Sequence, residues 1–255
     1  MKESCSPFSL NEVTATADAV GPKTPWSPHG LRRHFEILAR ISARFRRKRM
    51  RKFFHLLQPG QQTNILDVGG LPRLWEDAPV EAQTTIVNLE PLPPHEAYFL
   101  KPNQKFVQGN GTRLAWPDRS FDIVFSNSVI EHLGTWENQI AFAGECRRIG
   151  KAYWVQTPAR EFPVEPHFLT LFLHWFPKSL QKQLLRWFSL WGWLARPQPG
   201  AVAAAVEEVR LLTLQELKNL FPDGKILAER WLGLPKSYIA YRLPPPNGKS
   251  PECKP

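Results

Sequence analysis

Residues 64–70 read Asn-Ile-Leu-Asp-Val-Gly-Gly, a short apolar run that ends in an acidic residue and two glycines. The three aliphatic residues of this run are typical of a buried parallel strand. Gly69 and Gly70 allow a sharp turn and a close approach between backbone and ligand, because glycine has no Cβ atom. The stretch therefore predicts the first strand of an open α/β sheet, ending at a ligand-binding crevice.

Three further apolar runs follow along the chain, at residues 84–90, 105–110 and 120–126. Glu90 ends the second run and lies 23 residues after Asp67. This is close to the spacing at which a carboxylate binds the ribose hydroxyls of a nucleotide. The order of runs predicts a parallel sheet with a nucleotide site at its carboxyl edge.

Four segments in and around these runs resemble the motifs of a known family. They are Ile-Leu-Asp-Val-Gly-Gly (65–70), Val-Asn-Leu-Glu (87–90), the run from Gly-Asn-Gly-Thr to Ser-Phe-Asp (109–122) and Ser126–Leu133. In this order they resemble the motifs of class I S-adenosylmethionine-dependent methyltransferases, of the methyltransferase type 11-like kind. The resemblance implies a Rossmann-like sheet of seven mostly parallel strands, helices on both faces and S-adenosylmethionine as the cofactor.

The resemblance also implies which residues hold the cofactor. The first motif would bind the methionine end, and Glu90 the ribose. Asn110 stands where relatives commonly carry Asp, and its carbonyl oxygen can accept a hydrogen bond from the adenine amino group. The predicted cofactor-binding residues are Asp67, Gly69, Gly70, Glu90, Asn110, Gly111, Thr112, Asn127 and Ser128.

Two departures from the family pattern keep a second interpretation open. The family's third glycine, expected near Pro72 or Arg73, is missing, and Asn110 replaces the usual Asp. A non-catalytic relative of the same fold, which binds a membrane or a partner protein, is therefore an alternative to an enzyme.

Two histidines are candidates for catalysis. His132 follows the fourth run and has the side-chain pKa that suits a general base; a structural histidine that holds its loop is an equal alternative. His167 lies in the segment that follows the fifth predicted strand. Some quinone O-methyltransferases of this fold bind a metal through Glu-x-x-Glu-His, but Ser128 replaces the first Glu, so no metal is predicted.

The chain carries a formal net charge of +10 and ten tryptophans. Residues 44–52 hold seven positive charges in nine positions, which fits a solvated helix face or a patch for phosphate or anionic lipid. Nucleic acid is a weaker expectation, because a basic helix alone is no recognised nucleic-acid module. Three scattered cysteines and the absence of a signal-like apolar segment favour a cytoplasmic setting, with peripheral contact to the inner face of a membrane as an option.

The expected organisation is a flexible arm at 1–27, a methyltransferase domain at 28–243 and a disordered tail at 244–255. The domain begins with a basic helix at 28–58 and contains an α-helical insertion after the fifth strand, at 159–204. This insertion is rich in Leu, Trp and Phe and is predicted to be a lid over the acceptor. We therefore expect a small, apolar or lipid- or glycan-linked acceptor, with RNA or protein as the alternative. The sequence does not determine the oligomeric state.

Overall fold

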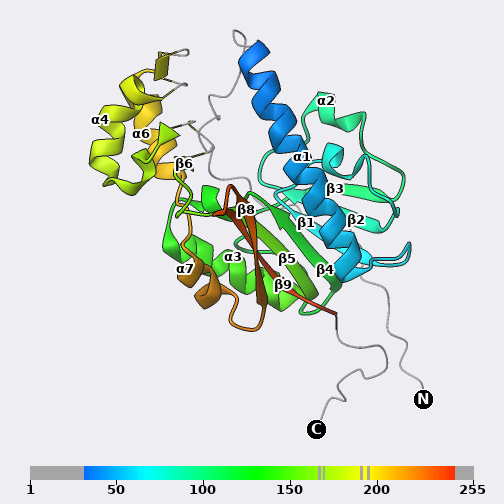
Figure 1. The fold of residues 1–255 in the computed structure, drawn as a ribbon. Coiled ribbons are helices and arrows are strands. Elements are labelled where there is room, and N and C mark those ends of the chain that lie inside the picture. The colour runs from blue at the N-terminus through cyan, green and yellow to red at the C-terminus, as the bar shows by residue number, and fades with distance from the viewer. Residues whose placement is uncertain (1–31, 166–167, 169, 190–191, 194–195, 245–255) are drawn as a thin grey trace, which may run out of the picture.

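A seven-stranded sheet forms the centre of the computed structural model, which describes residues 32–165, 168, 170–189, 192–193 and 196–244 (Figure 1). The order of the strands is β3-β2-β1-β4-β5-β9-β8. They span β1 (Asn64–Val68), β2 (Gln83–Asn88), β3 (Gln104–Gln108), β4 (Phe121–Asn127), β5 (Gly150–Pro158), β8 (Lys225–Trp231) and β9 (Leu234–Arg242). The first five strands run parallel, and β9 pairs antiparallel with β5 and β8. The predicted Rossmann-like sheet of seven mostly parallel strands is confirmed, and the β8–β9 hairpin forms its antiparallel edge.

One face of the sheet is covered by the long helix α1 (Arg32–Leu57) (Figure 1). The helix was predicted to begin at Pro28, which lies outside the described residues. Phe53 of α1 is completely buried. The centroid of its ring lies 5.0 Å from that of Phe125 and 5.8 Å from that of Trp154. Aromatic and aliphatic side chains therefore fix α1 against the sheet through its carboxyl-terminal half.

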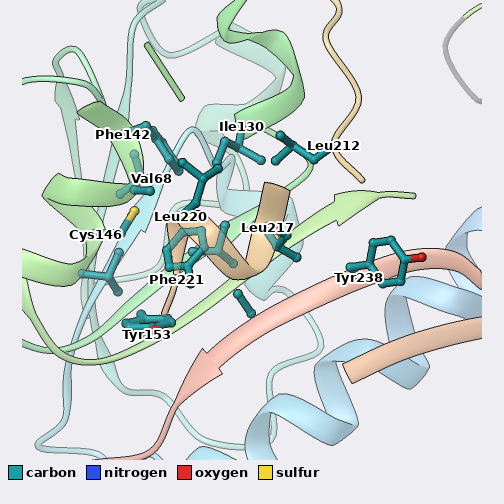
Figure 2. Packing of buried hydrophobic residues seen from close by; sticks show 14 of the residues in the cluster. Val68, Ile130, Phe142, Cys146, Tyr153, Leu212, Leu217, Leu220, Phe221 and Tyr238 are labelled. Carbon is teal, nitrogen blue, oxygen red and sulfur yellow. The ribbon is translucent and has the colours of Figure 1, made fainter. Parts of the chain in front are cut away.

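The opposite face carries α3 (Trp136–Ile149) and α7 (Leu214–Leu220). Figure 2 shows Phe142 and Cys146 of α3 beside the buried Val68 of β1, and Leu217 of α7 belongs to the same cluster. Burial, followed by the charge of Glu145, raises the pKa of the Cys146 thiol far above its ordinary value. Cys146 is thus a buried thiol of the core.

Short elements connect the strands. They are η1 (Pro72–Trp75), α2 (Pro94–Ala97) and η2 (Ile130–Leu133). Pro94 is the first residue of α2. The helix has only four residues, because the proline-rich turn before it leaves little room for a helix before β3. A capping box at Thr213 and Glu216 starts α7.

The segment after β5 folds around a small core of its own. It comprises β6 (Val164–Glu165), β7 (Thr170–Leu171), η3 (Leu173–Trp175), α4 (Lys178–Phe188) and α6 (Pro199–Glu208). Phe168, Leu173, Leu185, Val202 and Val206 are buried together. The two-stranded sheet was not predicted. The function of the segment as a lid stays a prediction.

The predicted arm at 1–27 and all of the predicted tail except Pro244 lie outside the described residues. Among the described helices, none has the length and apolarity needed to cross a membrane.

Candidate functional site

Parallel pairing brings the ends of four strands to one edge of the sheet. Val68 is paired with Val87, Asn88 with Gln108, and Asp67 with Phe125. The segments that follow these strands therefore begin at the same edge, where open α/β sheets bind ligands. All nine predicted cofactor-binding residues belong to these strand ends or the segments that follow them.

The loop after β1 depends on its two glycines. Gly69 has a φ of +78° and donates its N–H to the Val87 carbonyl at 2.7 Å. A Cβ atom at Gly69 would lie 2.5 Å from a Val129 methyl group, and one at Gly70 would lie 1.9 Å from Asp67 Oδ2. Both glycines are thus required by the packing of the loop onto its own strand neighbours.

Asp67 lies beneath this loop, completely buried. Its Oδ2 atom accepts a hydrogen bond from the Trp75 indole at 2.7 Å, whereas Oδ1 has no hydrogen-bond partner among the residues that the structure describes. Burial raises the pKa of Asp67 to about 7, and the Trp75 hydrogen bond opposes this rise. Where the family's third glycine is missing, the chain forms η1 and its tryptophan holds the acidic residue. The sequence did not suggest this role for Trp75.

Asn88 connects the glycine loop to Glu90. Its Nδ2 atom donates to the Gly70 carbonyl at 3.1 Å, and its Oδ1 accepts from the Glu90 N–H at 3.3 Å. The Glu90 side chain is exposed. Asn88 was part of a quoted motif but was given no function, because a side chain that joins two backbone segments leaves no spacing signal.

The predicted adenine segment follows β3. The Oδ1 atom of Asn110 accepts hydrogen bonds from the N–H and the hydroxyl of Thr112, at 2.9 and 2.8 Å. These two bonds engage the oxygen that was expected to receive the adenine amino group, so its Nδ2 is the atom that offers a further hydrogen bond. The side chain of Asn110 is exposed. Gly111 packs closely, since an added Cβ would meet Val68 at 2.8 Å.

The end of β4 is joined to α1 by a polar cluster. Arg49 of α1 donates through Nη1 to Asn127 Oδ1 and to Gln156 Oε1, and its Nη2 lies 2.6 Å from Glu229 Oε2. The Ser128 hydroxyl donates to the same Gln156 oxygen at 2.9 Å. The two predicted residues Asn127 and Ser128 therefore have protein partners, and sequence reasoning missed the other three members of this cluster.

His132 is half-buried in η2, the short helix that follows the end of β4. Its Nδ1 atom lies 3.3 Å from Glu208 Oε1 of α6. A carboxylate at this position orients an imidazole ring, as in many catalytic pairs. His167, the other catalytic candidate, lies outside the described residues.

The donor set fits an adenosine-containing cofactor at this edge. Glu90 offers an exposed carboxylate for ribose hydroxyls, and Asn110 offers an exposed amide for a purine. The unpartnered Oδ1 of Asp67 lies under the glycine loop, where the methionine end is expected. The individual assignments stay predictions.

Residues 69–152 match the family described as a methyltransferase domain. This span includes all the predicted cofactor residues except Asp67, and it includes His132. No curated protein matches the chain.

Solved structures share the fold at low sequence identity. The PH0226 protein from Pyrococcus horikoshii OT3 is 14% identical to this chain, with a TM-score of 0.50. The match covers 78% of this chain and 91% of that protein. A protein of an antibiotic biosynthesis pathway from Anabaena variabilis is 17% identical over 71% of this chain, with a TM-score of 0.45. Haemonchus contortus phosphoethanolamine N-methyltransferase 2, solved with S-adenosyl-L-methionine, is 10% identical over 69% of this chain, with a TM-score of 0.46. The chain spans 64% and 37% of the last two.

The match over residues 69–152 and the seven-stranded sheet support the fold of a class I, S-adenosylmethionine-dependent methyltransferase domain. S-adenosylmethionine is the cofactor of this class of domain.

Proposed function

We propose that the protein transfers a methyl group from S-adenosylmethionine to a small apolar or amphiphilic acceptor. The observation that carries this proposal is the assembly of the glycine loop, Glu90, Asn110 and the end of β4 on one edge of the sheet. The cofactor supplies an electrophilic methyl group on a sulfonium.

The residues of the chain then have separate tasks. Glu90 holds the ribose, and Asn110 contacts the adenine. Gly69 and Gly70 let the backbone approach the methionine end. His132 removes a proton from the acceptor, if the acceptor carries one. Positioning of the acceptor accounts for most of the remaining rate enhancement.

The apolar nature of the acceptor is supported by aromatic side chains beside the site. Phe45 of α1 and Phe162 of the insertion both contact the Trp231 ring, with centroids 6.5 and 5.9 Å away. The insertion itself exposes large aromatic side chains at Phe172, Trp175, Phe176, Trp187, Phe188 and Trp193. Such surfaces favour bulky apolar or lipid-linked molecules, and with the basic α1 they favour contact with an anionic membrane.

The test is a calorimetric titration with S-adenosylmethionine and S-adenosylhomocysteine. Glu90→Ala should weaken binding by about 1–3 kcal/mol, because a charged acceptor of two hydroxyl hydrogen bonds is lost. Glu81→Ala is the matched control: its carboxylate is exposed and precedes the same strand at the opposite edge. Binding followed by methyl transfer in a screen that starts with lipids would support the proposal.

Absence of binding at millimolar cofactor would instead favour the non-catalytic alternative. The engagement of Asn127 by Arg49 and of the Asn110 oxygen by Thr112 is the specific observation that keeps this second function in view.

A further inference from the structure

A cavity of about 760 Å³ lies between α1 and residues 73–79. Five arginines line it: Arg44, Arg46, Arg47, Arg51 and Arg73. Glu76 and Asp77 are the acidic residues of the lining, and Met50, Phe54 and Leu74 contribute apolar surface. The cavity is therefore strongly cationic, and apolar side chains form part of its lining.

The positive charge of the cavity is poorly compensated. Arg73 has a partner, because its Nε lies 3.3 Å from Glu96 and its guanidinium stacks 4.2 Å from the Phe99 ring centroid. Among the described residues, no carboxylate oxygen comes within 4.0 Å of the four α1 arginines of the lining. Burial, and after it the nearby charge of Arg49, lowers the pKa of Arg46.

The cavity is distinct from the predicted cofactor residues. None of the nine lines it. Lys48 and Lys52 also lie outside the lining, although they belong to the same basic run. The cations of the basic run therefore differ in surroundings: Arg44, Arg46, Arg47 and Arg51 line the cavity, Arg49 is buried against Glu229, and the two lysines lie elsewhere on the helix.

We propose that this cavity binds a phosphate-bearing ligand through Arg44, Arg47 and Arg51. Guanidinium groups bind phosphate oxygens in bidentate geometry, and an anion relieves the repulsion among clustered cations. The volume exceeds that of a single phosphate, so a pyrophosphate or a phosphoester with an apolar substituent fits the lining. This proposal goes beyond methyl transfer and can be tested without the cofactor.

The experiment measures pyrophosphate binding to the full chain by calorimetry at constant ionic strength. Arg47→Gln/Arg51→Gln should weaken binding by about tenfold or more, because two charge-assisted contacts are lost. Lys48→Gln/Lys52→Gln is the matched control, since it removes the same charge at the same helical spacing. It should weaken binding by less than about twofold, because charges outside the lining contribute only screened, long-range attraction.

A second pair separates charge from geometry and guards against a folding defect. Arg47→Lys/Arg51→Lys keeps the charge but loses the bidentate fork, so pyrophosphate binding should fall by about threefold or more. Thermal unfolding of each variant verifies that it is folded.

A vesicle arm identifies the source of the phosphate. Phosphatidylcholine vesicles with and without phosphatidic acid are sedimented with the same variants. Dependence on phosphatidic acid and on the arginine pair, without pyrophosphate binding, would assign the cavity to a lipid headgroup and support the proposal. Equal losses in the arginine and lysine pairs, no binding in either arm, or RNA binding that pyrophosphate does not displace would overturn it.

Discussion

Arg49 and Glu229 form a buried ion pair between two segments that are 180 positions apart in the chain. Their nearest atoms, Nη2 and Oε2, are 2.6 Å apart, and each side chain is only 6% exposed. The Ser237 hydroxyl donates a hydrogen bond to the same carboxylate. Burial raises the pKa of Glu229, but the Arg49 charge and hydrogen bonds outweigh it, so that pKa lies below its usual range. The pair joins α1 to the β8–β9 hairpin beside the end of β4.

Arg49→Ala should lower the free energy of unfolding by about 3–5 kcal/mol, because it leaves a buried carboxylate without its partner. Urea unfolding measures this as a lower midpoint at an unchanged m value. Arg49→Met/Glu229→Met should cost less than the single change, since neither charge remains. Lys48→Ala is the control and should stay within about 0.5 kcal/mol of the wild type. A loss below about 1 kcal/mol in Arg49→Ala would show that water solvates the carboxylate.

Asp67→Asn should change how stability depends on pH. The pKa of Asp67 is about 7 in the folded chain, raised by burial from an ordinary value of 3.8. Between these values the unfolded chain releases a proton that the folded chain keeps, so the free energy of unfolding falls as pH rises. Asp67→Asn lacks this titration, so its free energy of unfolding should rise relative to that of the wild type. We expect this relative gain to be on the order of 4 kcal/mol from about pH 4 to about pH 8.

Urea unfolding across this pH range isolates Asp67, because all other titrating groups are common to both proteins. Trp75→Phe provides the complementary change: it removes the hydrogen bond that stabilises the ionised carboxyl, so its stability should fall more steeply with pH than that of the wild type. A difference between Asp67→Asn and wild type that does not vary with pH would contradict the assignment.

The sheet could be predicted from the sequence because its signals are local. Apolar runs of strand length recur, and each ends at a polar or glycine-containing segment, as at Gly69 and Glu90. The short α2 could also be predicted, since prolines limit helix length. The two-stranded β6–β7 sheet was missed because strands of two residues carry no periodicity.

The contacts inside the site could not be predicted in the same way. Arg49 belongs to a run of similar cations, and nothing local distinguishes it from Lys48. Its burial results from Glu229, Asn127 and Gln156, which tertiary structure alone brings to it. In the same way, the sequence does not show that the Oδ1 atom of Asn110 accepts a hydrogen bond from Thr112. Whether this oxygen can also accept a hydrogen bond from adenine depends on the geometry of the turn.

Asn88→Ala should weaken cofactor binding although Asn88 need not touch the cofactor. Its side chain ties Gly70 to the Glu90 backbone, and loss of both hydrogen bonds frees the two segments. We expect a loss of about 0.5–1.5 kcal/mol in S-adenosylhomocysteine affinity by calorimetry. Asn88→Asp separates the two contacts, because it keeps the acceptor for the Glu90 N–H and loses the donor to Gly70. Unchanged affinity in Asn88→Ala would mean that the loop is held by the sheet alone.

Substitutions of His132 and of its partner Glu208 can distinguish a catalytic histidine from a structural one. If His132 removes a proton from the acceptor, His132→Ala should lower kcat about 10²–10⁴-fold, because general-base catalysis is lost. The affinity for S-adenosylhomocysteine should not change. Glu208→Gln keeps the side-chain shape but removes the negative charge 3.3 Å from Nδ1, so we expect a smaller fall in kcat at unchanged KM. Single-turnover methyl transfer to the acceptor found by screening provides both measurements. A full rate in His132→Ala, with lower thermal stability, would assign the histidine to holding η2 against α6.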